Sequence, residues 1–251
     1  MKRVPSKPKN TSRKWFDYAF EFIIIFASLY LTFELEDYGE YKNNREKEEV
    51  YLVSLHEDLN KDIEQLNRRI LEYENKLSDL TRLFQLLENY DEHIESIREL
   101  YLRHLNYTFL YSPVNNTFES LKSGGDIKLI ENQNFKILLS ELDKSYKTTI
   151  SSGQALKEFR EGDFWNNTII TSINTLNFNR IGENPDFEII MQNLLAIYIR
   201  HAEAYFFFLQ GSLEKSKEAR DLLSGELLYR GLIDEKPTKV TSEDIFEEFN
   251  K

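Results

Sequence analysis

Cysteine is absent from this chain of 251 residues. Its absence excludes disulfide bonds, thiolate catalysis and zinc sites with cysteine ligands. The motifs of common enzymes are missing too: the sequence has no Gly-x-Ser-x-Gly elbow, no phosphate-binding glycine loop and no His-Glu-x-x-His pair. We therefore expect no enzymatic activity, no cofactor and no metal site.

Basic residues are fewer than acidic ones, 32 against 43, which gives a net charge of −11. The first 14 residues carry six Lys or Arg and no acid, so residues 15–251 carry −17. A body of that charge cannot neutralise a phosphate backbone. We expect no nucleic-acid partner.

Long apolar segments are also scarce, and the only one lies between Trp15 and Leu35. Its uncharged run, 22–33, has 12 residues, whereas the whole segment has 21, enough for the ~20 that cross a bilayer core. The residues after the uncharged run, Glu34 to Tyr38, lack the small side chains that a signal peptidase recognises. The sequence favours an uncleaved signal anchor; a cleaved signal peptide and an interfacial helix are the alternatives.

The charges on either side of this segment predict its orientation. The +6 tail precedes the uncharged run 22–33, and Glu34, Glu36, Asp37 and Glu40 follow that run. Positive flanks stay in the cytoplasm. We expect a cytoplasmic tail at 1–14, an anchor in the lipid bilayer at 15–35, a helical domain outside the cytoplasm at 36–233 and an acidic tail at 234–251.

Four polar side chains fall on one face of the predicted anchor. Asp17, Glu21, Ser28 and Thr32 are spaced by 4, 7 and 4 residues, which confines them to an arc of about 60°. An intramembrane carboxyl usually faces protein or water. We interpret this stripe as a contact with another transmembrane helix, from a second copy or a membrane-protein partner; the alternative is that Glu21 only reaches the interface.

Glycine and proline are absent from 40–91, which predicts one uninterrupted helix there. Apolar residues follow steps of three and four, the period of a coiled-coil seam, at Leu52, Leu55, Leu59, Ile63, Leu66, Ile70, Tyr73, Leu77, Leu80, Phe84 and Leu87. Charged residues between them predict a solvated face, namely Lys61, Glu64, Arg68, Arg69, Glu72, Glu74, Lys76 and Asp79.

A second seam runs from Phe187 to Ser212 within a helix expected to reach about Tyr229. Asn184 is the predicted N-cap and Pro185 the first helical residue. Two long helices of matching period most simply pack antiparallel, so we expect the two seams to pack against each other.

Shorter helices are predicted between the two seams and in the tail. They cover 94–105, 116–123, 135–150, 156–176 and 242–249, with Gly124-Gly125 ending the second and a loose separation at Gly153. No stretch alternates with a period of two. The predicted fold class is therefore all-α: a transmembrane helix that continues into a long coiled-coil-like helix within an elongated antiparallel bundle.

Aromatic residues follow one another at 205–208, Tyr-Phe-Phe-Phe, and cover most of a helix circumference. This turn is either buried on all sides or, through Phe206 and Phe207, a partner contact. His93 and His104 are eleven residues apart and could form a metal pair, but exposed histidines explain them better. His201 lies on the second seam and is expected to be a buried histidine with satisfied hydrogen bonds.

Several short segments resemble a family of uncharacterised single-pass membrane proteins common in Bacteroidota. They are the basic tail, Glu21-Phe22-Ile23-Ile24, the acidic helix start with Tyr51-Leu52, Leu55, Asp58-Leu59 and Asp62, and Leu121-Lys122-Ser123-Gly124 followed by Leu129-Ile130. The resemblance implies a location in the cell envelope and no activity.

Together these features predict an inner-membrane protein of a diderm bacterium with most of its chain in the periplasm. We expect a helical scaffold or accessory subunit that acts through protein–protein contacts. The alternative is a sensory or ligand-binding bundle that relays its signal through a partner, since no second span follows residue 40.

Overall fold

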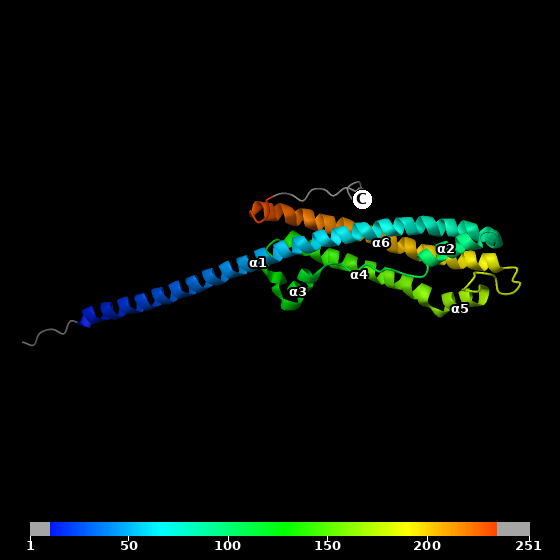
Figure 1. Cartoon of the computed structure of the whole chain (residues 1–251). Coiled ribbons are helices and arrows are strands. Elements are labelled where there is room, and N and C mark those ends of the chain that lie inside the picture. Colours follow the sequence, from blue (N-terminus) through cyan, green and yellow to red (C-terminus); the bar gives the residue numbers. More distant parts are fainter. Residues whose placement is uncertain (1–10, 235–251) are drawn as a thin grey trace, which may run out of the picture. The chain divides into compact units, whose positions relative to one another are not determined.

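The computed structural model describes residues 11–234 (Figure 1). These residues form α1 Thr11–Leu86, a 3-10 helix Leu87–Glu92, α2 Ile94–His104, α3 Asn116–Gly124, a 3-10 helix Asp126–Leu129, α4 Gln133–Glu161, α5 Asp163–Ser172 and α6 Phe187–Tyr229. The described residues contain no strand, only an isolated bridge between Ile173 and Arg180. The all-α class and the long N-terminal helix are confirmed.

The chain divides into two compact units between Val50 and Tyr51. In the first unit α1 is long and apolar enough to cross a membrane, and none of its most apolar 18-residue window is buried. The side chains exposed there include Phe22, Phe26 and Leu29. The predicted tail at 1–14 and the tail helix at 242–249 lie wholly or largely outside the described residues.

In the second unit the seam residues of α1 form part of the core, as their spacing predicts. Leu52, Leu55, Leu59, Ile63, Leu66, Tyr73, Leu80 and Leu87 are buried, while Ile70, Leu77 and Phe84 are partly buried against them. The α-helix ends at Leu86 instead of reaching residue 91. Asn89 leaves helical geometry, with φ −131° and ψ 60°, so the last predicted turn is a 3-10 helix.

Helices α4 and α6 lie side by side, with backbones closer than those of any other helix pair (Figure 1). Small hydroxyl side chains permit this approach: Thr149 lies 2.8 Å and Ser145 2.9 Å from the Ser212 hydroxyl. A Cβ at Gly153 would lie 2.7 Å from the Tyr205 ring. Glycine therefore marks a close contact inside α4; the break predicted at Gly153 is wrong, and the helix ends instead at Glu161, before Gly162.

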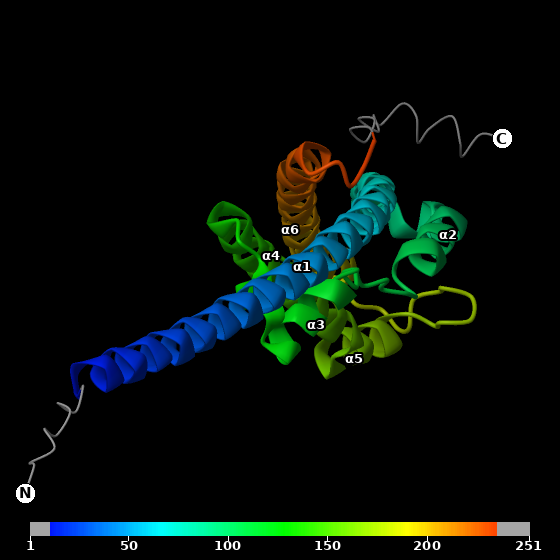
Figure 2. The ribbon, with the colours of Figure 1, turned by 90° about the vertical axis from the view of Figure 1, so that its left-hand side faces the viewer.

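The predicted pairing of the two seams is partly correct. The Tyr73 ring of α1 meets the Tyr205 ring of α6 at 4.9 Å between centroids, edge to face. The closest partner of α6 is nevertheless α4, and α1 reaches α6 through longer side chains. Figure 2, turned by 90°, shows α4 next to α6, as their close backbone contact requires.

Two helix ends can be compared with their sequence signals. Gly125 caps α3 in the left-handed region, with φ 72°, as the glycine pair predicts. Asp186, rather than Asn184, is the N-cap of α6. Asn184 instead accepts a hydrogen bond from the Asp186 backbone N–H at 3.0 Å, which places the helix start two residues later than predicted.

Candidate anion-binding pocket

The four polar residues of the predicted anchor lie along the N-terminal part of α1. Glu21, Ser28 and Thr32 are exposed. The Ser28 hydroxyl donates to the Ile24 carbonyl at 2.8 Å, and the Thr32 hydroxyl to the Ser28 carbonyl at 2.9 Å. Both hydroxyls are thus satisfied within their own helix. Their role as a helix contact stays a prediction, as does that of Asp17.

The aromatic run divides between core and surface. Tyr205 is buried, Phe206 and Phe208 are half-buried, and Phe207 is 67% exposed. Burial on all sides, the first of the two sequence interpretations, is therefore wrong for the chain by itself. Of the two candidate contact residues, Phe206 packs on the core and Phe207 faces outward.

The histidines are not brought together. His104 Nε2 lies 2.6 Å from Asp79 Oδ2, and His201 is half-buried with its ring stacked on Phe159 at 5.2 Å. Within residues 11–234 no three His, Asp or Glu side chains are grouped so that they could hold a metal ion.

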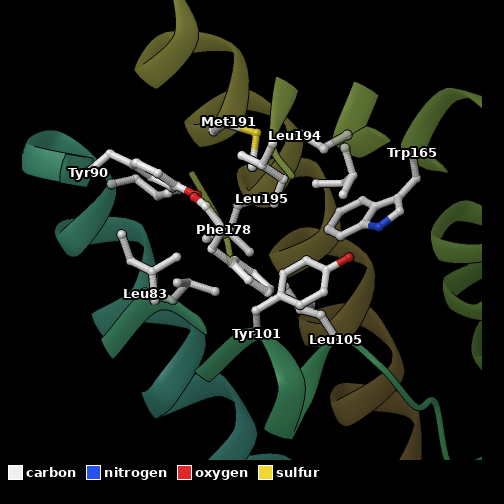
Figure 3. Close-up of a pocket in the computed structure, with 13 residues that line it drawn as sticks. Leu83, Tyr90, Tyr101, Leu105, Trp165, Phe178, Met191, Leu194 and Leu195 are labelled. Atoms are coloured by element: carbon white, nitrogen blue, oxygen red, sulfur yellow. The ribbon is translucent and has the colours of Figure 1, made fainter. Parts of the chain in front are cut away.

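The two best-formed hollows of the bundle differ in chemistry. The first lies at the end formed by α2, α5 and parts of α1 and α6, and Figure 3 shows its lining. All of its lining side chains are apolar or aromatic, and the space left between them is about 20 Å³. Figure 3 shows the Tyr101 hydroxyl near the Trp165 indole. A hollow that holds about one water molecule is part of the packed core.

The second hollow is far larger, about 480 Å³, within the usual range for ligand pockets. It lies between α1, the C-terminal end of α2 and the loop that follows α2. Its lining is polar and aromatic: Arg69, Glu72, Tyr73, Asn75, Lys76, Arg103, His104, Tyr107 and Phe109. We call it the cationic pocket.

Lys76 is the unusual residue of this pocket. Only 8% of it is exposed, and no described carboxylate lies within 4 Å of its ammonium nitrogen. The nitrogen instead lies 5.3 Å from the Tyr73 ring centre and 5.2 Å from that of Tyr198. Burial, helped by the nearby Arg160 charge, lowers the pKa of Lys76 to about 8. The amine therefore remains mostly charged at pH 7 without a counter-ion.

The remaining charges of the pocket favour a ligand of negative charge. Arg69, Lys76 and Arg103 give the lining three positive charges against one from Glu72, in a chain of net charge −11. Glu72 is paired with Arg69, but the buried Nε of Arg69 has no hydrogen-bond partner. Arg103 pairs with Glu99 and with Asp79, neither of which belongs to the lining.

One wall of the pocket is the loop 105–115, which polar contacts hold in place. Arg160 of α4 donates to the Asn106 carbonyl at 3.0 Å and to the Thr108 hydroxyl at 3.1 Å. The Tyr111 backbone N–H donates to the Tyr205 hydroxyl at 2.6 Å. Tyr107 and Phe109 are therefore carried by a segment with fixed ends.

Asp62 of α1 fixes the far end of this loop. Its carboxylate accepts hydrogen bonds from the Tyr111 and Tyr146 hydroxyls, both at 2.6 Å, from the Val114 N–H at 2.9 Å and from the Ser216 hydroxyl at 3.1 Å. Burial raises the pKa of Asp62, and these hydrogen bonds oppose that shift. One fully buried carboxylate thus joins α1, the loop, α4 and α6.

No protein-family model, curated protein or solved structure matches this chain. The resemblance to the Bacteroidota family accordingly stays a prediction.

The sequence did not predict the cationic pocket, because the spacing of its charged residues Arg69, Glu72 and Lys76 indicated a solvated face. Lys76 is buried, and Arg69 and Asp79 are half-buried, instead of being exposed. The sequence does contain one signal: Lys76 directly precedes the seam residue Leu77 and follows Tyr73 by three. A residue at the edge of a seam is covered or exposed according to which partner packs beside it.

Proposed function

We propose that this protein is a membrane-anchored helical bundle that binds a small organic anion in the cationic pocket. The observation that supports it most is the buried Lys76 ammonium without a carboxylate partner, next to a 480 Å³ hollow. A buried charge normally requires a partner. A bound carboxylate or similar anion would supply one, which favours the ligand-binding alternative over the scaffold. We propose binding and no catalytic step.

The test is a thermal titration of the full chain in mild detergent with acetate, sulfate and benzoate, at constant ionic strength. At 100 times its Kd a ligand adds about 2.7 kcal/mol to folding stability, which raises Tm by several degrees. Lys76→Met should abolish this shift. Lys61→Met is the matched control, since Lys61 lies on the same helix and its side chain is 64% exposed. The proposal fails if no anion raises Tm, or if Lys76→Met responds like the wild type.

The cellular location that we propose for this protein is inferred from the charge asymmetry around the apolar segment. The anchor would cross the inner membrane at 15–35, with the N-terminus in the cytoplasm and the bundle in the periplasm. A phosphatase reporter, active only after export, should be active when fused after Lys251. Activity of a cytoplasmic reporter at the same position would contradict this topology.

A scaffold role remains the second candidate, and the exposure of Phe207 favours it. A phenyl ring that is 67% exposed beside the half-buried Phe206 is suited to a contact with another protein. Such a contact could join two copies of the chain or a membrane-protein partner. If it joins two copies, Phe207→Ser should lower the mass of the detergent-solubilised protein measured by light scattering, whereas Tyr229→Ser, an exposed aromatic of the same helix, should not.

A further inference from the structure

The cationic pocket has an aromatic rim in addition to its charge. Tyr107 is 65% and Phe109 64% exposed, and their rings lie roughly parallel, with 27° between planes and 6.3 Å between centres. Both line the pocket. Two adjacent aromatic rings left largely in water would gain free energy if a ligand covered them.

Polar contacts tie the backbone of the rim to the bundle. The Phe109 carbonyl accepts a hydrogen bond from the Tyr73 hydroxyl at 3.4 Å, and the Arg69 guanidinium lies over the Phe109 ring at 5.7 Å. Together with the Arg160 contacts to Asn106 and Thr108, these interactions attach the loop to α1 and α4. Pre-organised rings bind a flat partner with little loss of conformational freedom.

The polar groups favour a carboxylate over a tetrahedral dianion. The free donors are the Lys76 ammonium, which has no counter-ion, and the Nε of Arg69, which has no hydrogen-bond partner although its guanidinium is paired with Glu72. Arg103 is paired with Glu99 and Asp79, and Glu72 adds a negative charge to the lining. A second negative charge on the ligand would therefore meet repulsion from Glu72 with few donors to compensate it.

We infer that the ligand is a flat aromatic carboxylate, whose acid group pairs with Lys76 and whose ring stacks on Tyr107 and Phe109. This inference rests on the proposed function, since it names the class of anion that the pocket takes. It commits to a monoanion with a planar ring. Three compounds test these properties against benzoate. Acetate has the carboxylate without a ring, cyclohexanecarboxylate has a ring that is not flat, and sulfate is a tetrahedral dianion.

The experiment is isothermal titration of the full chain in mild detergent with benzoate, cyclohexanecarboxylate, acetate and sulfate. Benzoate should bind about tenfold more tightly than acetate, and several-fold more tightly than cyclohexanecarboxylate, which matches its size without a flat ring. The double variant Tyr107→Ser/Phe109→Ser should lose that preference and keep its affinity for acetate. Phe164→Ser removes an aromatic with the same exposure on α5 and should change nothing.

Each remaining outcome contradicts a different claim. If benzoate binds no better than acetate, or if the double variant keeps the preference for benzoate, the aromatic ligand class is wrong while the proposed anion binding stands. Sulfate binding more tightly than benzoate would also overturn the carboxylate class alone. If Lys76→Met binds acetate and benzoate as well as the wild type does, both this inference and the proposed function are wrong.

Discussion

The helix α1 presents two different apolar surfaces along its length. Within 22–33 the apolar side chains point in every direction and are exposed, as Phe26 is at 64%. From Leu52 onward they recur at steps of three and four and are buried, as Leu66 is at 0%. The two segments share one secondary structure, so the difference lies in the apolar pattern. A continuous apolar surface suits lipid, and a periodic one suits neighbouring helices.

Two buried charged residues of α1 also differ in the partners that surround them. Asp62 accepts four hydrogen bonds from three parts of the chain. Lys76, fourteen residues later on the same helix, has two aromatic rings and no carboxylate. The first is a completed structural link. Lys76 lacks a counter-ion, which is why we propose that an anion binds there.

The largest effect is expected from charges placed in the first surface. Phe26→Arg combined with Leu29→Arg should cost about 5–7 kcal/mol of membrane insertion, since each arginine at the centre of a span costs about 2.5–3.5 kcal/mol. The fraction of the full chain that resists alkaline carbonate extraction from membranes should collapse. Ser78→Arg, at an exposed position of the same helix, is the control. If the double variant stayed in the membrane fraction, the two surfaces would not differ as argued.

Removing the Asp62 carboxylate should cause the largest loss of bundle stability. Asp62→Ala leaves the Tyr111 hydroxyl and the Val114 N–H without their acceptor and removes one of two partners of the Tyr146 hydroxyl, which should lower the free energy of unfolding by about 3 kcal/mol. Urea denaturation of the full chain in mild detergent, followed by tryptophan fluorescence, measures it. Asp58→Ala, which removes one hydrogen bond to the Thr117 N–H, should cost only about 1 kcal/mol. Equal losses would show that Asp62 is not the central link.

Lys76→Met should stabilise the bundle in the absence of ligand, by an amount that depends on pH. The folded-state pKa of Lys76 is about 8, below its ordinary 10.5, so the unfolded chain binds more protons between these values. The cost of the buried charge is full below pH 8 and is relieved as pH rises towards 10.5. The advantage of Lys76→Met should therefore shrink by about 2 kcal/mol between pH 7 and pH 9.5.

Differences in unfolding free energy at the two pH values measure this effect, because tyrosine ionisation cancels between variant and wild type. Lys61→Met, the exposed control, should show no such trend. A Lys76→Met variant that is less stable than the wild type at pH 7 would mean that the ammonium is already paired.

The smallest effect is expected from the polar stripe of the anchor. If this face contacts a second transmembrane helix, single cysteines from Ser28→Cys should crosslink more than those from Phe26→Cys. The chain has no other cysteine. Glu21→Leu should reduce the Ser28→Cys crosslink by at most a few-fold, because polar contacts between membrane helices average about 0.6 kcal/mol. Equal crosslinking at both positions, unchanged by Glu21→Leu, would leave the anchor as a membrane tether.

Local patterns predicted the helices well where period and capping residues agree. The seam from Leu52 to Leu87, the glycine cap at Gly125 and the end of α6 near Tyr229 all follow from residues close in sequence. The prediction failed at Gly153, where a glycine that suggests a break is required by the Tyr205 ring of another helix. It also misplaced the start of α6 by two residues, because Asn184 caps its own turn.

The candidate site was much less predictable than the helices. Arg69 and Lys76 belong to a charged face by their spacing, and Tyr107 and Phe109 lie in a loop about thirty residues further on. Nothing in the sequence states that these segments meet. They meet because Asp62 and Arg160 hold the loop against α1 and α4 through contacts between distant residues.

The sequence by itself determined the helical class, the apolar segment suited to a membrane and the face of α1 that is buried. These properties depend on the period of the chain and on the charge of neighbouring residues. Only the tertiary structure decided that α4 is the closest partner of α6, that Lys76 is buried without a counter-ion and that an aromatic rim lies beside it. A heptad seam fixes which face needs a cover, while the covering element depends on long-range packing of side chains whose sizes happen to fit.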